Sequence, residues 1–248
     1  SGVYNTGTIK SLTNNTYSGN KAYNGGGLYN SGIIDAIENE VYSNNSATLA
    51  GGAITNLATI NTINATFTNN SVTDENSFGG AIFNSGKIGS INGIFDGNTS
   101  TSGGGAIANF VTINTINATF TNNSTTDENS FGGTIFNSGK IGSINGIFDG
   151  NTSTSGGGAI VNVGEISSIS GKFTNNQAKV AGGAILTGDV SNEKLTLNAN
   201  LKEIKNSIFE NNKVTDKSGG GGAIMNNQFT NTLNINSSSF NSNSANDG

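Results

Sequence analysis

The sequence predicts an all-β protein: a right-handed single-stranded parallel β-helix, or solenoid, of about nine coils of roughly 25 residues, with three short strands per coil. Three observations predict it. A Gly-Gly-small-apolar element recurs along the chain, an aromatic-x-x-Asn element alternates with it, and apolar and polar residues alternate within each unit. Because one unit of this length cannot bury a core alone, the units are expected to stack on one another.

The Gly-pair element occurs eight times, at spacings of 25, 28, 25, 28, 25, 25 and 39 residues. Glycine tolerates backbone conformations and close approaches that other residues do not, so each pair is expected to let the backbone bend where no side chain fits. The pairs begin at Gly26, Gly51, Gly79, Gly104, Gly132, Gly157, Gly182 and Gly221.

The aromatic-x-x-Asn element occurs nine times. Stacking would place its rings in one internal ladder, in which each buried ring contributes about 1.5–3 kcal/mol. The Asn three residues later would form a ladder of amides at a corner of the coil. The aromatic residues are Tyr17, Tyr42, Phe67, Phe95, Phe120, Phe148, Phe173, Phe209 and Phe240.

Within a unit the local period is two, which is typical of a strand. Ile63, Ala65 and Phe67 fall on one face of such a strand, and the polar residues between them fall on the other. We expect three strands per coil: Gly-Gly-Ala-Ile-x-Asn, a middle segment that carries Ile, and the aromatic segment. Asn-Ser-Gly at 84–86 and 137–139 predicts tight turns in which Asn and Gly adopt positive φ.

The spacing between the middle apolar residue and the aromatic residue is not uniform. It is four residues in the middle coils, as from Ile63 to Phe67, and five in the outer coils. One extra residue in a strand predicts a β-bulge in those outer coils. The outer apolar residues are Leu12, Ile37, Ile204 and Ile235.

Residues 59–107 recur at 112–160 with two differences, Val72 against Thr125 and Ala81 against Thr134. This indicates recent duplication of a two-coil block. The whole chain, 1–248, is expected to form a single β-helix domain that is a segment of a longer repeat array, because it begins and stops within a repeat. The region 186–206 breaks the period and is expected to be an insertion or an enlarged coil.

Composition excludes several functions. The net charge is −5 and the chain has no Arg, which argues against nucleic-acid binding. It has no Cys and no His, so thiolate and imidazole metal sites are excluded. No apolar run approaches the ~20 residues that span a bilayer, so no membrane span is expected in this segment, and no signal peptide opens it.

Repeated Gly-Gly-Ala-Ile alternating with Phe-x-x-Asn resembles the passenger domains of polymorphic outer-membrane proteins, the chlamydial autotransporter adhesins, over nearly the whole chain from Tyr17 to Asn243. The resemblance implies a bacterial cell-surface, extracellular, non-enzymatic adhesin or structural passenger. Its rod would attach to a host or environmental surface receptor, either a protein or a glycan.

Three loops interrupt the regular coil just after the aromatic-x-x-Asn element, at 72–77, 125–130 and 213–218. They would form an acidic ridge for a partner or a weakly held divalent cation; alternatively, they are solvated loops that keep the rod soluble. Calcium requires six to eight oxygen ligands, which one Asp-Glu pair does not supply, so no metal or cofactor is predicted. The acidic residues are Asp74, Glu75, Asp127, Glu128 and Asp216.

The second candidate surface is the insertion, which carries Lys194, Lys202, Glu203 and Lys205. Insertions from a solenoid wall often bind partners, although they are also simply tolerated there. No catalytic residue is predicted, because the acids recur in duplicate and no His or Arg accompanies them. The alternatives are a polysaccharide-active β-helix enzyme, and a self-assembling extracellular filament subunit whose ends associate.

Overall fold

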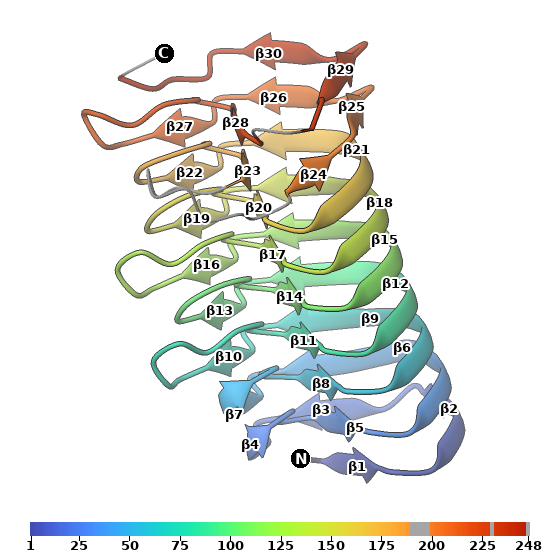
Figure 1. Cartoon of the computed structure of the whole chain (residues 1–248). Coiled ribbons are helices and arrows are strands. Elements are labelled where there is room, and N and C mark those ends of the chain that lie inside the picture. The colour runs from blue at the N-terminus through green and yellow to red at the C-terminus, as the bar shows by residue number, and fades with distance from the viewer. Residues whose placement is uncertain (189–198, 229–230, 247–248) are drawn as a thin grey trace.

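The computed structural model describes residues 1–188, 199–228 and 231–246, and it is the parallel β-solenoid that the sequence predicts (Figure 1). Its described strands form three parallel sheets, in which each strand pairs with the equivalent strand of the coil before it and the coil after it. Within these residues, no helix has the length and apolar character of a membrane-spanning segment.

Sheet A contains the strands that follow the Gly pairs. Its register places like residues over like: Ile82 pairs with Ile54 on one side and with Ile107 on the other. Its strands, in spatial order, are β1 (Val3–Asn5), β5 (Leu28–Asn30), β8 (Ile54–Asn56), β11 (Ile82–Asn84), β14 (Ile107–Asn109), β17 (Ile135–Asn137), β20 (Ile160–Asn162), β23 (Ile185–Gly188) and β28 (Ile224–Asn227).

Sheet B contains the long strands and is the outer wall of the solenoid body. Its strands are β2 (Thr8–Thr13), β3 (Thr16–Ser18), β6 (Ile33–Ser43), β9 (Thr59–Thr68), β12 (Lys87–Asp96), β15 (Thr112–Thr121), β18 (Lys140–Asp149), β21 (Glu165–Thr174), β24 (Asn200–Leu201), β25 (Glu203–Lys205), β26 (Ile208–Glu210), β29 (Asn234–Asn236) and β30 (Ser239–Asn241).

Sheet C contains short strands that follow the aromatic-x-x-Asn corner. Its strands are β4 (Lys21–Asn24), β7 (Ser46–Ala50), β10 (Ser71–Val72), β13 (Thr99–Ser100), β16 (Ser124–Thr125), β19 (Thr152–Ser153), β22 (Gln177–Ala178) and β27 (Lys213–Val214).

Three strands per coil are confirmed, but the strand assignment differs from the expected one. In the middle coils the Ile-bearing segment and the aromatic segment are one continuous ten-residue strand, such as β9. Ile60 and Ile63 are both buried while Asn61 and Thr62 between them face outward, so the corner lies inside the strand. Because pairing with the next coil continues through this corner, the strand bends without breaking.

The Gly pairs fulfil two separate requirements. From the second coil on, the first Gly of the pair adopts positive φ, as at Gly79 with φ 72°; in the first coil Gly25, and not Gly26, takes this place with φ 57°. The second lies so close to the next coil that a Cβ on Gly80 would be 2.1 Å from the carbonyl oxygen of Gly105. A side chain there would separate the two coils.

The Asn-Ser-Gly corners are present, but the expected positive φ is wrong for them: neither Asn84 nor Gly86 is among the positive-φ residues. The amide oxygen of Asn84 instead accepts a hydrogen bond from the Gly86 backbone N–H at 3.3 Å. Gly86 is required because a Cβ there would lie 2.1 Å from the carbonyl oxygen of Ala58 in the preceding coil.

The predicted bulge is confirmed. The register between β6 and β9 shifts between Glu38 and Glu40, where Asn39 has φ 55°. The residue two positions after the apolar residue has positive φ in each of the four outer coils; these residues are Asn14, Asn39, Asn206 and Ser237.

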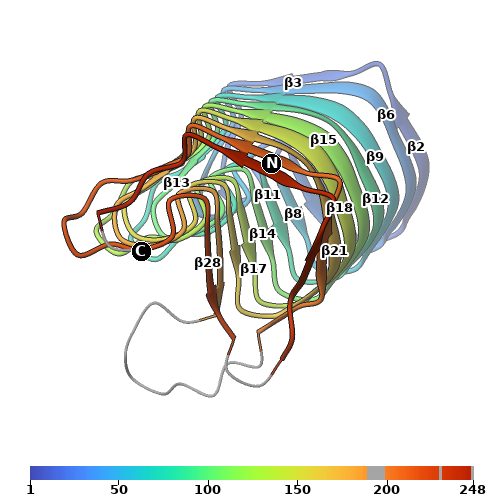
Figure 2. The same ribbon diagram turned by 90° about the horizontal axis from the view of Figure 1, so that it is seen from above.

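The aromatic ladder is also confirmed. Successive rings stack with centroids 4.5–5.1 Å apart, and Phe67 to Phe209 are fully buried between sheets A and B. Seen along the axis, the coil is a wide body, with sheet B as its curved wall, and a narrower lobe that contains β13 and the rest of sheet C (Figure 2).

Candidate functional site

The acidic loops all project from the lobe that carries sheet C, beyond β10, β16 and β27 (Figure 1). Because only β13 separates β10 from β16, the loops of Asp74 and Asp127 begin about 10 Å apart. β19 and β22 lie between β16 and β27, so Asp216 is about 14 Å further along the same lobe. The structure thus aligns the acidic residues on one lobe but does not gather them into one cluster.

The backbone of each acidic loop is fastened to the following coil. The hydroxyl of Thr101 donates to the Asp74 carbonyl at 2.6 Å and accepts from the Ser77 backbone N–H at 3.1 Å. In the second copy the hydroxyl of Thr154 makes the equivalent bond to the Asp127 carbonyl, and Ser130 bonds to the same hydroxyl. The loops are therefore held in place through backbone groups.

Asp74, Glu75 and Glu128 are exposed, Asp127 and Asp216 are partly buried, and the five carboxylates have few partners. Those of Asp74, Glu75, Asp127 and Glu128 make no hydrogen bond or ion pair with any described residue. Asp216 differs, because hydrogen bonds from the Ser218 backbone and hydroxyl hold its pKa below the ordinary value. No group of three or more acidic, His or Cys side chains able to hold a metal occurs in the described ranges.

The described lysines of the insertion surface are paired, one with the neighbouring strand β21 and one within the insertion. Lys202 forms an ion pair with Glu165 at 2.7 Å, and Lys205 forms one with Glu203 at 2.7 Å. These lysines hold the pKa values of both glutamates below the ordinary range. Lys194 lies outside the described residues.

The described part of the insertion rejoins sheet B. Leu201 on β24 pairs with Ile166 on β21, and Ile204 on β25 pairs with Ile169. These residues are therefore part of the stacked coils and not of a hairpin that projects from them.

Two ladders of asparagine amides run along two corners of the coil and hold in place the surfaces described above. The predicted ladder runs from Asn20 to Asn243, with each Nδ2 donating to the Oδ1 of the next coil at 2.8–3.1 Å. A second ladder, which the sequence reasoning missed, runs from Asn5 to Asn162 along the ends of the sheet A strands at 2.7–2.8 Å. The signal for it was the Asn at the end of each Gly-Gly-Ala-Ile-x-Asn segment.

A polar group inside the N-terminal coils was also missed. The bulge turns Glu40 inward to the position that Ala65 occupies in the next coil. Its Oε1 accepts from the backbone N–H and the side chain of Asn15, both at 2.9 Å, while its Oε2 has no partner among the described residues. Burial and the nearby Glu40 raise the pKa of Tyr17 to about 12 and that of Tyr42 well above its ordinary value.

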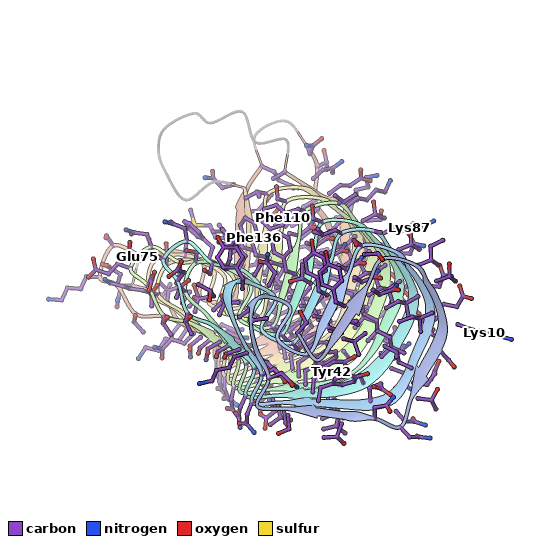
Figure 3. All side chains as sticks on the ribbon, turned by 90° about the horizontal axis from the view of Figure 1, so that it is seen from below. Lys10, Tyr42, Glu75, Lys87, Phe110 and Phe136 are labelled. Atoms are coloured by element: carbon purple, nitrogen blue, oxygen red, sulfur yellow. The ribbon has the colours of Figure 1, made fainter. Side chains whose placement is uncertain are left out.

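The most distinct surface feature is an apolar groove on the outer face of sheet A, beside the lobe. In Figure 3, Phe110 and Phe136 lie between the lobe that carries Glu75 and the body of the coil. Ring centroids are 5.4 Å apart for Phe78 and Phe136, and 5.9 Å apart for Phe110 and Phe136. We call this surface the aromatic groove; it is made by Phe78, Phe83, Phe110, Phe131, Phe136 and Val163.

Two adjoining cavities make up the aromatic groove, and they share Asn76 and Phe78. One has a volume of about 500 Å³ and includes Asp127 and Glu128 in its lining. The other has a volume of about 360 Å³ and no charged residue in its lining. The sequence reasoning assigned no role to these phenylalanines.

The comparison with protein families identifies the repeat. Five segments match the Chlamydia polymorphic membrane protein repeat, and each contains one aromatic-x-x-Asn element and the Gly-pair element after it. No curated protein and no solved structure gives a significant match. The matched segments are residues 64–85, 92–109, 145–163, 170–188 and 206–227, so this protein is a solenoid that carries Chlamydia polymorphic membrane protein repeats across residues 64–227.

Proposed function

We propose that this chain is a segment of a non-enzymatic, extracellular adhesin passenger, a rigid rod that attaches a bacterial cell to a host or environmental surface. The family to which the repeat belongs implies association with the outer membrane or the cell surface. The observation that carries the proposal is the agreement between the repeat and the matched segments: each segment supplies one ring and one corner amide to ladders that run the length of the solenoid.

Rigidity is what the ladders supply to such a rod. Each buried amide both donates to and accepts from its neighbours, so no coil can tilt without breaking bonds to two others. Nearest-neighbour stacking of this kind lets a solenoid extend while its exposed faces vary. The loops of the lobe and the aromatic groove are the faces that vary here.

The proposal is tested by attachment of beads coated with the purified chain to cultured epithelial cells. We expect saturable attachment that excess soluble chain blocks. Beads that carry a Phe120→Ala, Asn123→Ala variant should attach less, because this variant loses a ring and an amide from the same coil. Beads that carry Thr134→Ala, which leaves both ladders intact, should attach like the parent.

Attachment no greater than that of beads coated with an unrelated acidic protein would contradict the proposal. Turnover of an acidic glycan by the chain, lost on Asp74→Asn or Asp127→Asn substitution, would replace it with the enzyme alternative.

A further inference from the structure

The aromatic groove is apolar, long and open to solvent. Phe78, Phe110 and Phe136 are partly exposed although their rings contact one another. The groove extends from Tyr29 in β5 to Val163 after β20; these two strands are five strand spacings, or about 24 Å, apart in sheet A. An extended polypeptide of about seven residues has this length.

Among the described residues that line the aromatic groove, the charged ones are all acidic. Asp127 and Glu128 are the charged residues in the lining of its larger cavity. Lys179 lines a separate cavity on the lobe, which Glu128 also lines. Since neither carboxylate is paired with a described residue, both are free to meet a cation at the mouth of the groove.

We propose that the aromatic groove binds an extended, cationic and apolar polypeptide segment of a partner protein. In an extended segment successive side chains point to opposite faces, so apolar side chains can contact Phe110 and Phe136 while Lys or Arg side chains reach the rim. A second copy of this chain fits less well, because it would set the same unpaired carboxylates against one another.

This inference deepens the proposed function, since it names the chemistry of a partner for the rod, but its test needs only the purified chain. The probe is a fluorescent eight-residue amidated peptide in which Lys and Leu alternate. Two control peptides replace Lys by Glu, or Leu by Ser. Fluorescence anisotropy measures binding at low and high salt.

The Lys-Leu peptide should bind, and both control peptides should bind at least tenfold more weakly. Phe110→Ala or Phe136→Ala should weaken binding of the Lys-Leu peptide about tenfold, because each removes apolar contact area from the groove. Ile94→Ala truncates an exposed apolar side chain on the outer face of sheet B, away from the aromatic groove, and should change binding less than twofold.

The duplicated loop supplies a matched control for charge. Asp127→Asn with Glu128→Gln should weaken binding several-fold and reduce its dependence on salt. The same pair of changes at Asp74 and Glu75, whose carboxylates do not line either cavity, should change binding less than twofold. Circular dichroism confirms that each variant is folded.

No binding of the Lys-Leu peptide, equal binding of the Glu-Leu peptide, or binding unchanged by both groove variants would overturn the inference. Dimerisation in sedimentation that is lost on Phe110→Ala would overturn it in favour of a second copy. Bead attachment that survives Phe110→Ala would leave the adhesin proposal intact while removing the aromatic groove from it. Peptide binding without bead attachment would leave the inference about the aromatic groove intact and would contradict the adhesin proposal.

Discussion

The two copies of the duplicated block, 59–107 and 112–160, have the same fold but not the same chemistry. Val72 in the first copy is replaced by Thr125 in the second, and Ala81 by Thr134. All four residues are buried, and the hydroxyls of Thr125 and Thr134 have no hydrogen-bond partner among the described residues. The second copy therefore carries two unsatisfied polar groups that the first copy lacks, and the stack tolerates them.

The copies also differ in what surrounds them. Lys87 of the first copy pairs in register with Thr59 and Thr112, whereas Lys140 of the second pairs with Thr112 and Glu165. The same sequence thus meets different neighbours at the edges of the block. Equal effects of a mutation in both copies report on the stack itself, and unequal effects report on the neighbours.

The largest expected effect is the loss of a stacked ring. Phe67→Ala and Phe120→Ala should each lower the free energy of unfolding by about 3–5 kcal/mol, because both rings are fully buried and stack on rings above and below. Urea denaturation followed by circular dichroism measures both. In the preceding coil Phe67 stacks on Tyr42, whereas Phe120 stacks on Phe95. A difference of more than about 1 kcal/mol between the two variants would show that Tyr42 changes the stability of the ladder.

Loss of a corner amide ranks next. Asn70→Ala and Asn123→Ala should each cost about 2–3 kcal/mol, because each leaves buried donors and acceptors in the adjoining coils without partners. The exposed Asn117→Ala, which loses one bond of 3.4 Å to Asn92, is the control and should cost less than about 0.5 kcal/mol. An equal cost at all three positions in urea titrations would contradict the assignment of the ladder as a structural element.

The difference between the copies just before β11 and β17, Ala81 against Thr134, gives an effect of opposite sign. Thr134→Ala should stabilise the protein by about 1 kcal/mol, because it removes a buried hydroxyl that has no partner from a column otherwise formed by alanines such as Ala106 and Ala159. The reciprocal change, Ala81→Thr, should destabilise the first copy by a similar amount. Thermal melting of the two variants beside the parent checks the signs. Destabilisation by Thr134→Ala would mean that the hydroxyl has a partner, such as a buried water.

The ring and amide ladders consist of residues that recur in every coil, and such features could be predicted from the sequence. A residue that recurs in every unit, such as the Phe or the corner Asn, has to stack on itself when units pile up. The five-residue spacing before Tyr42 predicted the bulge for the same reason, because an extra residue in one coil has to be accommodated against the next.

Features that depend on positions that do not recur in every coil could not be predicted in this way. The aromatic groove is formed at outward positions of sheet A, where Thr55, Phe83, Ala108 and Phe136 succeed one another, so that the aromatic residue recurs only through the duplication and not in every coil. Whether such a side chain is covered depends on how far the lobe folds over sheet A, which no local period encodes. Glu40 was missed because only the bulge turns it inward.

The smallest expected effect is at the edge of the block, where the copies differ in charge. Lys140 Nζ lies 3.6 Å from Glu165 Oε1, while Lys87 has no carboxylate partner among the described residues. Lys140→Gln should therefore cost slightly more than Lys87→Gln, by no more than about 0.5 kcal/mol, because exposed ion pairs are weak. Lys202→Gln should cost more than Lys140→Gln, since Lys202 is nearer, at 2.7 Å, and contributes most to lowering the pKa of Glu165.

The dependence of these costs on pH follows from the pKa of Glu165. Because folding lowers this pKa below its ordinary value of 4.5, the stabilisation is fully present above that pH and is lost as the pH falls through the folded-state pKa. The difference between the Lys140 and Lys87 variants should accordingly vanish in acid, and also in 1 M salt, where the Debye length is about 3 Å. If urea midpoints show a difference that persists under both conditions, it arises from packing of the lysine stem against its neighbours and not from charge.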